Sequence, residues 1–140
     1  MTRSQGVAAQ VGRCLLGWFF ISQAIQRLNE WQATTVLVQM KHVPFGMPLL
    51  SLSLLAMMMA SFGLISGFKI RFSALVLALC TAAWIGIAHN FWTILNASER
   101  SSDFLLFSLG VAIIGGLLCL AASGGGRFAL DTIKAAPQAD

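Results

Sequence analysis

The stretch FSALVLALCTAAWIGIAHNFW, Phe72–Trp92, contains no Lys, Arg, Asp or Glu. The hydrocarbon core of a bilayer is about 30 Å thick, and roughly 20 mostly apolar helical residues cross it. Three further runs have this length: Val7–Ile25, Leu49–Gly67 and Phe104–Ala122. Because unpaired backbone groups are not tolerated in lipid, each run should be an α-helix. The sequence therefore predicts an all-α membrane protein, a four-transmembrane-helix bundle with no room for a soluble catalytic domain.

The composition indicates a single membrane domain. Of the 140 residues, 57% are hydrophobic and only 10% are charged, whereas soluble domains carry about a quarter charged residues. We expect residues 1–131 to form the membrane domain and residues 132–140 a short polar C-terminal tail. The basic residues are scattered singly along the chain, so the sequence predicts contact with membrane lipid and no binding of nucleic acid.

The distribution of Lys and Arg predicts the topology. The side that holds both termini has Arg3, Arg13, Lys69, Arg71, Arg127 and Lys134. The other side has Arg27, Lys41 and Arg100. Because short cytoplasmic segments carry the excess of basic residues, we expect a multi-pass protein of the inner, cytoplasmic membrane with both termini in the cytoplasm.

The segment Arg27–Pro48 is too polar to span a membrane and too apolar for a plain loop. Its pattern predicts a short interfacial helix anchored by Trp31, with Val38 on its apolar side. Pro44 and Pro48 follow and start the second span. This helix is interpreted either as a connector that shields the outer mouth of the bundle or as a lid over a ligand site.

Small residues recur at spacings of three or four positions in three of the predicted spans. The rows are Ala74, Ala78, Ala82 and Gly86; Ser108, Ala112 and Gly116; and Ala56, Ala60, Gly63 and Gly67. Helices in lipid associate through close packing at small residues. The rows therefore predict a compact bundle.

Arg13 is an ionisable residue inside the first predicted span, where no acidic residue accompanies it. Ionisable groups within spans usually face the bundle interior or water. One interpretation is an arginine that reaches the cytoplasmic headgroups. A second is a structural pair with Asp131, just beyond the fourth span, and a third is ligand binding.

His89 lies near the outer end of the third span, between Trp84 and Trp92. It is a candidate proton carrier or ligand group, because imidazole titrates near neutral pH; the alternative is an interfacial histidine within an aromatic belt. We expect no metal site, because no second His, Cys or carboxylate stands at ligand spacing. Cys80 is nine residues away, which predicts the opposite helix face.

Two further groups of polar or reactive residues leave their roles open. Cys14, Cys80 and Cys119 all fall in predicted spans and form no CxxC pair, and their spacing does not decide whether any of them has a redox role. Gln23 and Arg27 form a polar cluster at the outer end of the first span. Together with the aromatic walls around it, this cluster makes a ligand or proton pathway a candidate function, and a quinone one candidate ligand.

Six short landmarks stand at the ends of the spans. They are Arg13–Gly17, Ala24–Leu28, Val43–Pro44, Gly67–Ala74, Ala88–Trp92 and Gly124–Asp131. In this order the chain resembles the DoxX family of small four-helix membrane proteins. It departs from that pattern at Ala24, where the family usually has glycine, at Arg27, where it has lysine, and at Ala56–Ala60, where many relatives carry a glutamate.

The resemblance implies a redox-associated role, because members have been linked to thiosulfate:quinone oxidoreductase subunits and to complexes for oxidative-stress defence. The leading hypothesis is therefore an accessory subunit that binds another membrane protein or itself, without a catalytic centre of its own. The alternatives are a small transporter or permease for a lipophilic or weakly acidic solute, with Arg13 and His89 as pathway groups, and a structural assembly factor.

Overall fold

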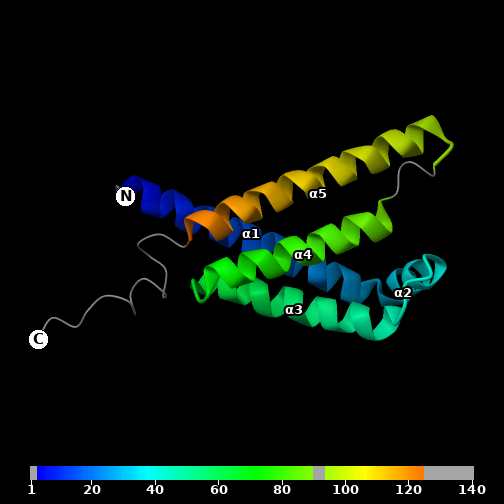
Figure 1. The fold of residues 1–140 in the computed structure, drawn as a ribbon, viewed down its shortest axis with the longest axis horizontal. Coiled ribbons are helices and arrows are strands. Elements are labelled where there is room, and N and C mark those ends of the chain that lie inside the picture. The colour runs from blue at the N-terminus through cyan, green and yellow to red at the C-terminus, as the bar shows by residue number, and fades with distance from the viewer. Residues whose placement is uncertain (1–2, 90–93, 125–140) are drawn as a thin grey trace, which may run out of the picture.

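The computed structural model describes residues 3–89 and 94–124. The helices are α1 (Arg3–Asn29), α2 (Trp31–Met40), α3 (Gly46–Ser66), α4 (Ile70–Ala88) and α5 (Ala97–Ser123). Four long helices lie along one another, and the short α2 packs at one end of the bundle (Figure 1). The prediction of an all-α protein is confirmed over these ranges, in which all regular structure is helical.

Three helices in the described part of the chain, α3, α4 and α5, are long and apolar enough to cross a membrane. The 27 residues of α1 also have sufficient length, but Gln10, Arg13 and Gln23 interrupt its apolar run. The prediction of four transmembrane helices is therefore not confirmed, because length and composition support three spans. The protein is a helical, multi-pass membrane protein.

The helices extend beyond the apolar runs at most of their ends. The last helix begins at Ala97 rather than at Phe104, because the Asn96 side chain caps it by accepting a hydrogen bond from the Ser98 amide. An apolar run measures the length of chain in hydrocarbon, whereas capping decides where a helix starts. By contrast, α4 ends at Ala88, before the predicted end of its span at Trp92. The part of that span after His89 lies outside the described residues.

Helices α3 and α4 are joined by a tight turn at Gly67–Lys69. Gly67 has φ 80°, in the left-handed region that favours glycine. The amides of Gly67 and Phe68 both donate to the carbonyl of Gly63, which closes the end of α3. The turn brings α4 back antiparallel to α3, and Gly63 then approaches Ser73 so closely that an added Cβ would lie 2.5 Å from its Oγ.

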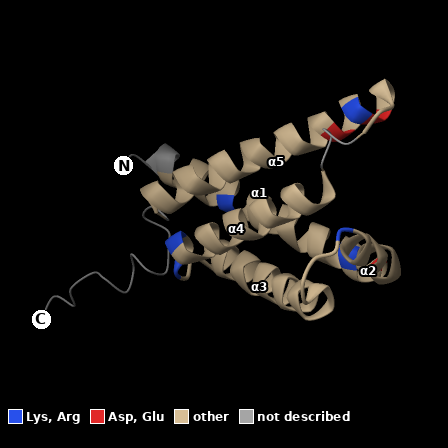
Figure 2. Cartoon of the chain, turned by 45° about the vertical axis from the view of Figure 1, so that its right-hand side comes forward, with Lys and Arg blue, Asp and Glu red and all other residues tan. Residues whose placement is uncertain are grey.

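One core connects the four long helices. Its buried members are Phe20 and Ala24 of α1, Leu54, Met57, Ala60 and Leu64 of α3, Ile70, Ala74, Leu77 and Ala78 of α4, and Leu117 of α5. Helix α4 packs against both α3 and α5, while α1 packs on α3. The charged residues lie mostly toward the ends of the bundle, and those acidic residues that the structure describes lie at the end with α2 and the start of α5 (Figure 2).

The predicted interfacial helix exists as α2. It buries Thr34, Thr35 and Val38, and Val38 lies against Gly46 at the start of α3. Met40, a further apolar residue of this segment, is 73% exposed. The helix therefore docks on α3 through a smaller face than the sequence predicts.

The prediction that the rows of small residues form the helix contacts is only partly confirmed. Ala74 and Ala78 of α4 and Ala60 of α3 are in the core, but Ala82 and Gly86 are exposed. On α5 the prediction was wrong: Ala112 is exposed, and a Cβ added at Gly116 would meet nothing within 4 Å. Gly110 and Leu117 face the core instead.

Candidate functional site

Arg27 lies in the last turn of α1 and reaches into the bundle. Its guanidinium carbon is 4.0 Å from the centre of the Trp84 ring on α4. Its Nη1 is 3.6 Å from the sulfur of Met57 on α3. Neither partner carries a negative charge, and no carboxylate within the described ranges forms an ion pair with Arg27. The arginine is thus held by a ring face and a thioether, and most of its N–H donors remain available.

A first cavity, of about 350 Å³, lies beside Arg27 between α3 and α4. The end of α2 and the start of α3 also contribute to it, through Val38 and Gly46. Its walls are almost entirely aliphatic or aromatic; Arg27 is the one charged group among the residues that line it, and Ser53 is the one hydroxyl. A single cation at the edge of an apolar cavity is the kind of polar group that fixes a ligand's orientation.

A second cavity, of about 330 Å³, lies on the other side of Arg27, between α1, α4 and α5. It is more polar than the first, because Gln23, Thr81 and His89 all line it. The two cavities share four residues: Arg27, Met57, Cys80 and Trp84. The Arg27 guanidinium and the groups that hold it therefore form the partition between the two cavities.

His89 is hydrogen-bonded to a carboxylate at the end of the second cavity that lies beside the last residue of α4. Its Nδ1 is 2.8 Å from Oδ1 of Asp103 on α5, and both side chains are mostly buried. Oδ2 of Asp103 is also buried and has no hydrogen-bond partner among the described groups. The pair joins the end of α4 to the first half of α5. Along the chain, residues 89–96 connect these two helices.

Sequence reasoning chose His89 but did not single out Asp103. The available signal was that both residues stand near the outer ends of consecutive spans joined by a short connection. Cys80 and His89 both line the second cavity. The amide of His89 still donates to the carbonyl of Ile85, so the predicted nine-residue separation along α4 stays a prediction of opposite faces.

Arg13 lies apart from both cavities, about 21 Å from Arg27 along the axis of α1. Its side chain is only 1% exposed, and its Nη2 donates a hydrogen bond to Oε1 of Gln10. Its Nε and Nη1 have no partner in the described part of the chain. Asp131, its predicted partner, lies outside the described residues. The structure therefore places Arg13 and Arg27 in separate environments.

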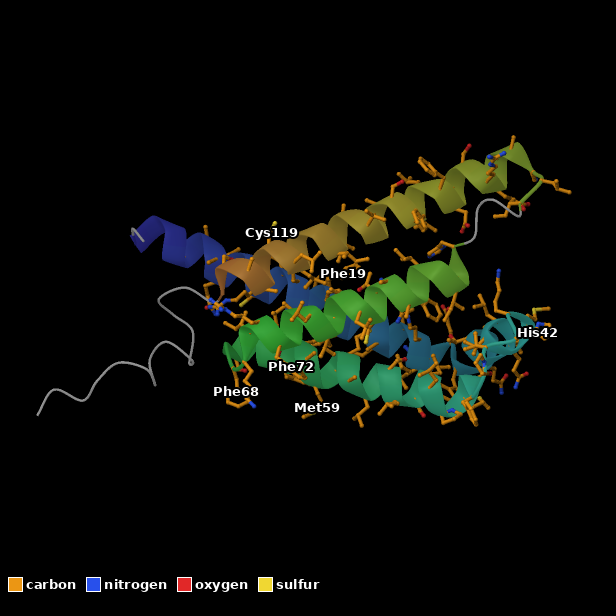
Figure 3. The ribbon with its side chains drawn as sticks, in the orientation of Figure 1. Phe19, His42, Met59, Phe68, Phe72 and Cys119 are labelled. Carbon is orange, nitrogen blue, oxygen red and sulfur yellow. The ribbon has the colours of Figure 1, made fainter. Side chains whose placement is uncertain are left out.

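The three cysteines are free thiols in different surroundings. Cys80 lines both cavities. The Sγ of Cys14 accepts a hydrogen bond from Gln10 at 3.7 Å. Cys119 is exposed on the outward side of α5, and Phe19 lies between the helices (Figure 3). The three thiols therefore form no common site.

A comparison with protein families matches residues 3–136 to the SURF4 family. The match covers almost the entire chain. The chain belongs to the SURF4 family. No match was found among curated proteins or among solved structures.

Assignment to the SURF4 family overturns the resemblance to the DoxX family, which was wrong. The landmarks that carried the resemblance are short and stand at helix ends. Tight basic turns, glycines and aromatic residues at those positions serve the turns and interfaces of any small membrane bundle. The redox association that the resemblance implied has no support in a SURF4-family protein. The comparison and the structure support a SURF4-family membrane protein with apolar helices.

Proposed function

We propose that this SURF4-family protein binds a lipophilic anion within the membrane, and that Arg27 pairs with the anionic head group. The observation that carries the proposal is a guanidinium set between two largely apolar cavities, whose cation–π and hydrogen-bond partners among the described residues are an aromatic ring and a thioether. The apolar walls would hold the hydrocarbon part of the ligand.

The electrostatics of the site favour an anion over a neutral ligand. A charge removed from water without a counter-charge costs several kcal/mol. A cation–π contact offsets about 2 kcal/mol of this when the pair is desolvated. A bound carboxylate, sulfonate or phosphate would supply the missing charge and accept from the planar N–H groups of Arg27 in a bidentate manner.

Binding of this kind supports the transporter interpretation, in which the solute is lipophilic or weakly acidic. Both cavities border Arg27, so a ligand has two approaches to the same charge. A quinone, by contrast, is neutral and would not require the arginine. An accessory role beside another membrane protein remains a prediction from the sequence.

The test uses the protein in nanodiscs of phosphatidylcholine, with a tail-brominated dodecyl sulfonate as the probe. Bromine quenches tryptophan on contact, and a background in which Trp18, Trp31 and Trp92 are phenylalanine leaves Trp84 as the reporter. We expect saturable quenching of Trp84 that Arg27→Gln weakens tenfold or more, because hydrogen bonds to charged groups contribute about 1.5–3 kcal/mol. Arg27→Lys, which keeps the charge, should retain most of the binding.

Arg100→Gln is the matched control, because Arg100 is exposed on α5 and lines neither cavity. Its binding curve should match that of the parent. A brominated dodecyl trimethylammonium probe tests the sign of the charge and should bind weakly. Coincident curves for the parent and Arg27→Gln would contradict the proposal, as would equal binding of the cationic probe.

A further inference from the structure

The second cavity is lined by a second ionisable side chain besides Arg27. His89 lines this cavity together with Arg27, and its Nδ1 is 2.8 Å from Oδ1 of Asp103. We infer that the His89–Asp103 pair is a proton-binding site linked to the anion site, so that the anion and a proton bind cooperatively. The inference rests on the proposed function, since it assumes an anion at Arg27.

The charge of the pair follows from its hydrogen bond. With Nδ1 as the donor to Oδ1 of Asp103, the neutral imidazole and the ionised carboxylate together carry one negative charge. When the second ring nitrogen, Nε2, takes up a proton, the imidazolium and the carboxylate sum to zero. Oδ2 of Asp103 has no hydrogen-bond partner among the described groups, and the ion-pair partner that the described residues give Asp103 is His89.

Few other ionisable groups line the same cavity. From α1 it receives the permanent charge of Arg27 and the neutral Gln23, and from α3 only Met57. Helix α4 adds the Cys80 thiol beside His89, and the residues of α5 that line it are apolar. The His89–Asp103 pair is thus the group at this cavity that can take up a proton while Arg27 keeps its permanent charge.

The sign of the linkage is fixed by these charges. The negatively charged pair repels an anion in the cavity, and protonation removes that repulsion. Two unit charges about 10 Å apart at an effective dielectric constant of about 20 interact strongly enough to change an affinity about tenfold. Anion binding should therefore strengthen as the pH falls, and each bound anion should take up as much as one proton.

The experiment measures Trp84 quenching by the brominated dodecyl sulfonate between pH 5 and 8. A sulfonate stays ionised over this range, so the probe's own titration does not contribute. We expect the parent protein to bind about tenfold more tightly at pH 5 than at pH 8. His89→Gln should bind at all pH values with the affinity that the parent has at pH 8. Asp103→Asn should bind more tightly than the parent at pH 8.

His42→Gln is the matched control, since His42 is exposed in the loop after α2 and lines neither cavity (Figure 3). It should keep the parent's pH dependence. Binding by His89→Gln at pH 8 also shows that this variant is folded. If the parent's affinity depends on Arg27 but not on pH, or if His89→Gln keeps the full pH dependence, the proton linkage is wrong and the anion site stands. If Arg27→Gln binds as the parent does, the anion site itself is wrong.

Discussion

Replacing Gly17 by leucine should lower the melting temperature of the protein by on the order of 10 °C. A Cβ at this position would lie 2.4 Å from Cγ1 of Ile65 and 3.3 Å from the backbone carbonyl oxygen of Ser61. The Ile65 side chain has to move, and the Ser61 carbonyl is backbone, so α1 must separate from α3. Overpacking of this kind costs about 1–3 kcal/mol, occasionally more, and each kcal/mol is worth roughly 3 °C in a chain of this size.

The control is Gly12→Leu on the same helix. A Cβ at Gly12 meets nothing within 4 Å, and leucine has a higher helix propensity than glycine by about 0.8 kcal/mol. This variant should therefore melt at the parent temperature or slightly above it. The measurement is thermal unfolding in detergent, followed by the loss of monodisperse protein on size exclusion. Equal melting temperatures for the two variants would mean that α1 does not pack on α3 at Gly17.

The spans that could be predicted from sequence are those with a strong compositional signal. Phe72–Trp92 has no charged residue, and the helix found there, α4, is one of three that can cross a membrane. The first run, Val7–Ile25, was harder to assign as a span. It is long enough to cross a membrane, but Arg13 and its glutamines make it less apolar. Length and polarity are separate requirements, and α1 meets only one of them.

The orientation of each helix about its axis could not be predicted, and the errors on α5 show why. This helix is apolar on nearly every side, so hydropathy does not mark the face that meets the core. Gly110 and Leu117 are seven residues apart and share a face, whereas Ala112 and Gly116 lie on another. Spacing by four identifies a row, but only the packing of α4 against α5 selects which row is buried.

Candidate site residues were predictable to the extent that ionisable groups are rare in spans. His89 stands out for that reason, Arg27 belongs to the polar cluster just beyond the first predicted span, and both line the second cavity. Their contacts were not predictable, because Met57, Trp84 and Asp103 come from three other parts of the chain. Sequence distance does not reveal that a ring and a thioether meet the same guanidinium.

Replacing Asp131 by asparagine should lower the melting temperature by on the order of 10 °C, through Arg13. Arg13 is 1% exposed, and only its hydrogen bond to Gln10 is satisfied. Its Nε and Nη1 have no acceptor within residues 3–89 and 94–124, so a buried guanidinium there requires a counter-charge from elsewhere. Asp131 is the acidic residue that the sequence predicts for this role. Breaking a buried ion pair by removing one partner costs about 3–5 kcal/mol.

A double-mutant cycle separates the pair from a general effect of either substitution. Arg13→Met removes the charge that Asp131→Asn would leave unpaired, so the double variant should regain most of the lost stability, since replacing both partners of a buried pair is often neutral. Asp140→Asn, which removes the other acidic residue of the same tail, is the control and should melt as the parent does. If Asp131→Asn melts unchanged, the pairing is wrong. Arg13→Met should then raise the melting temperature, because it would remove an uncompensated charge from the apolar interior.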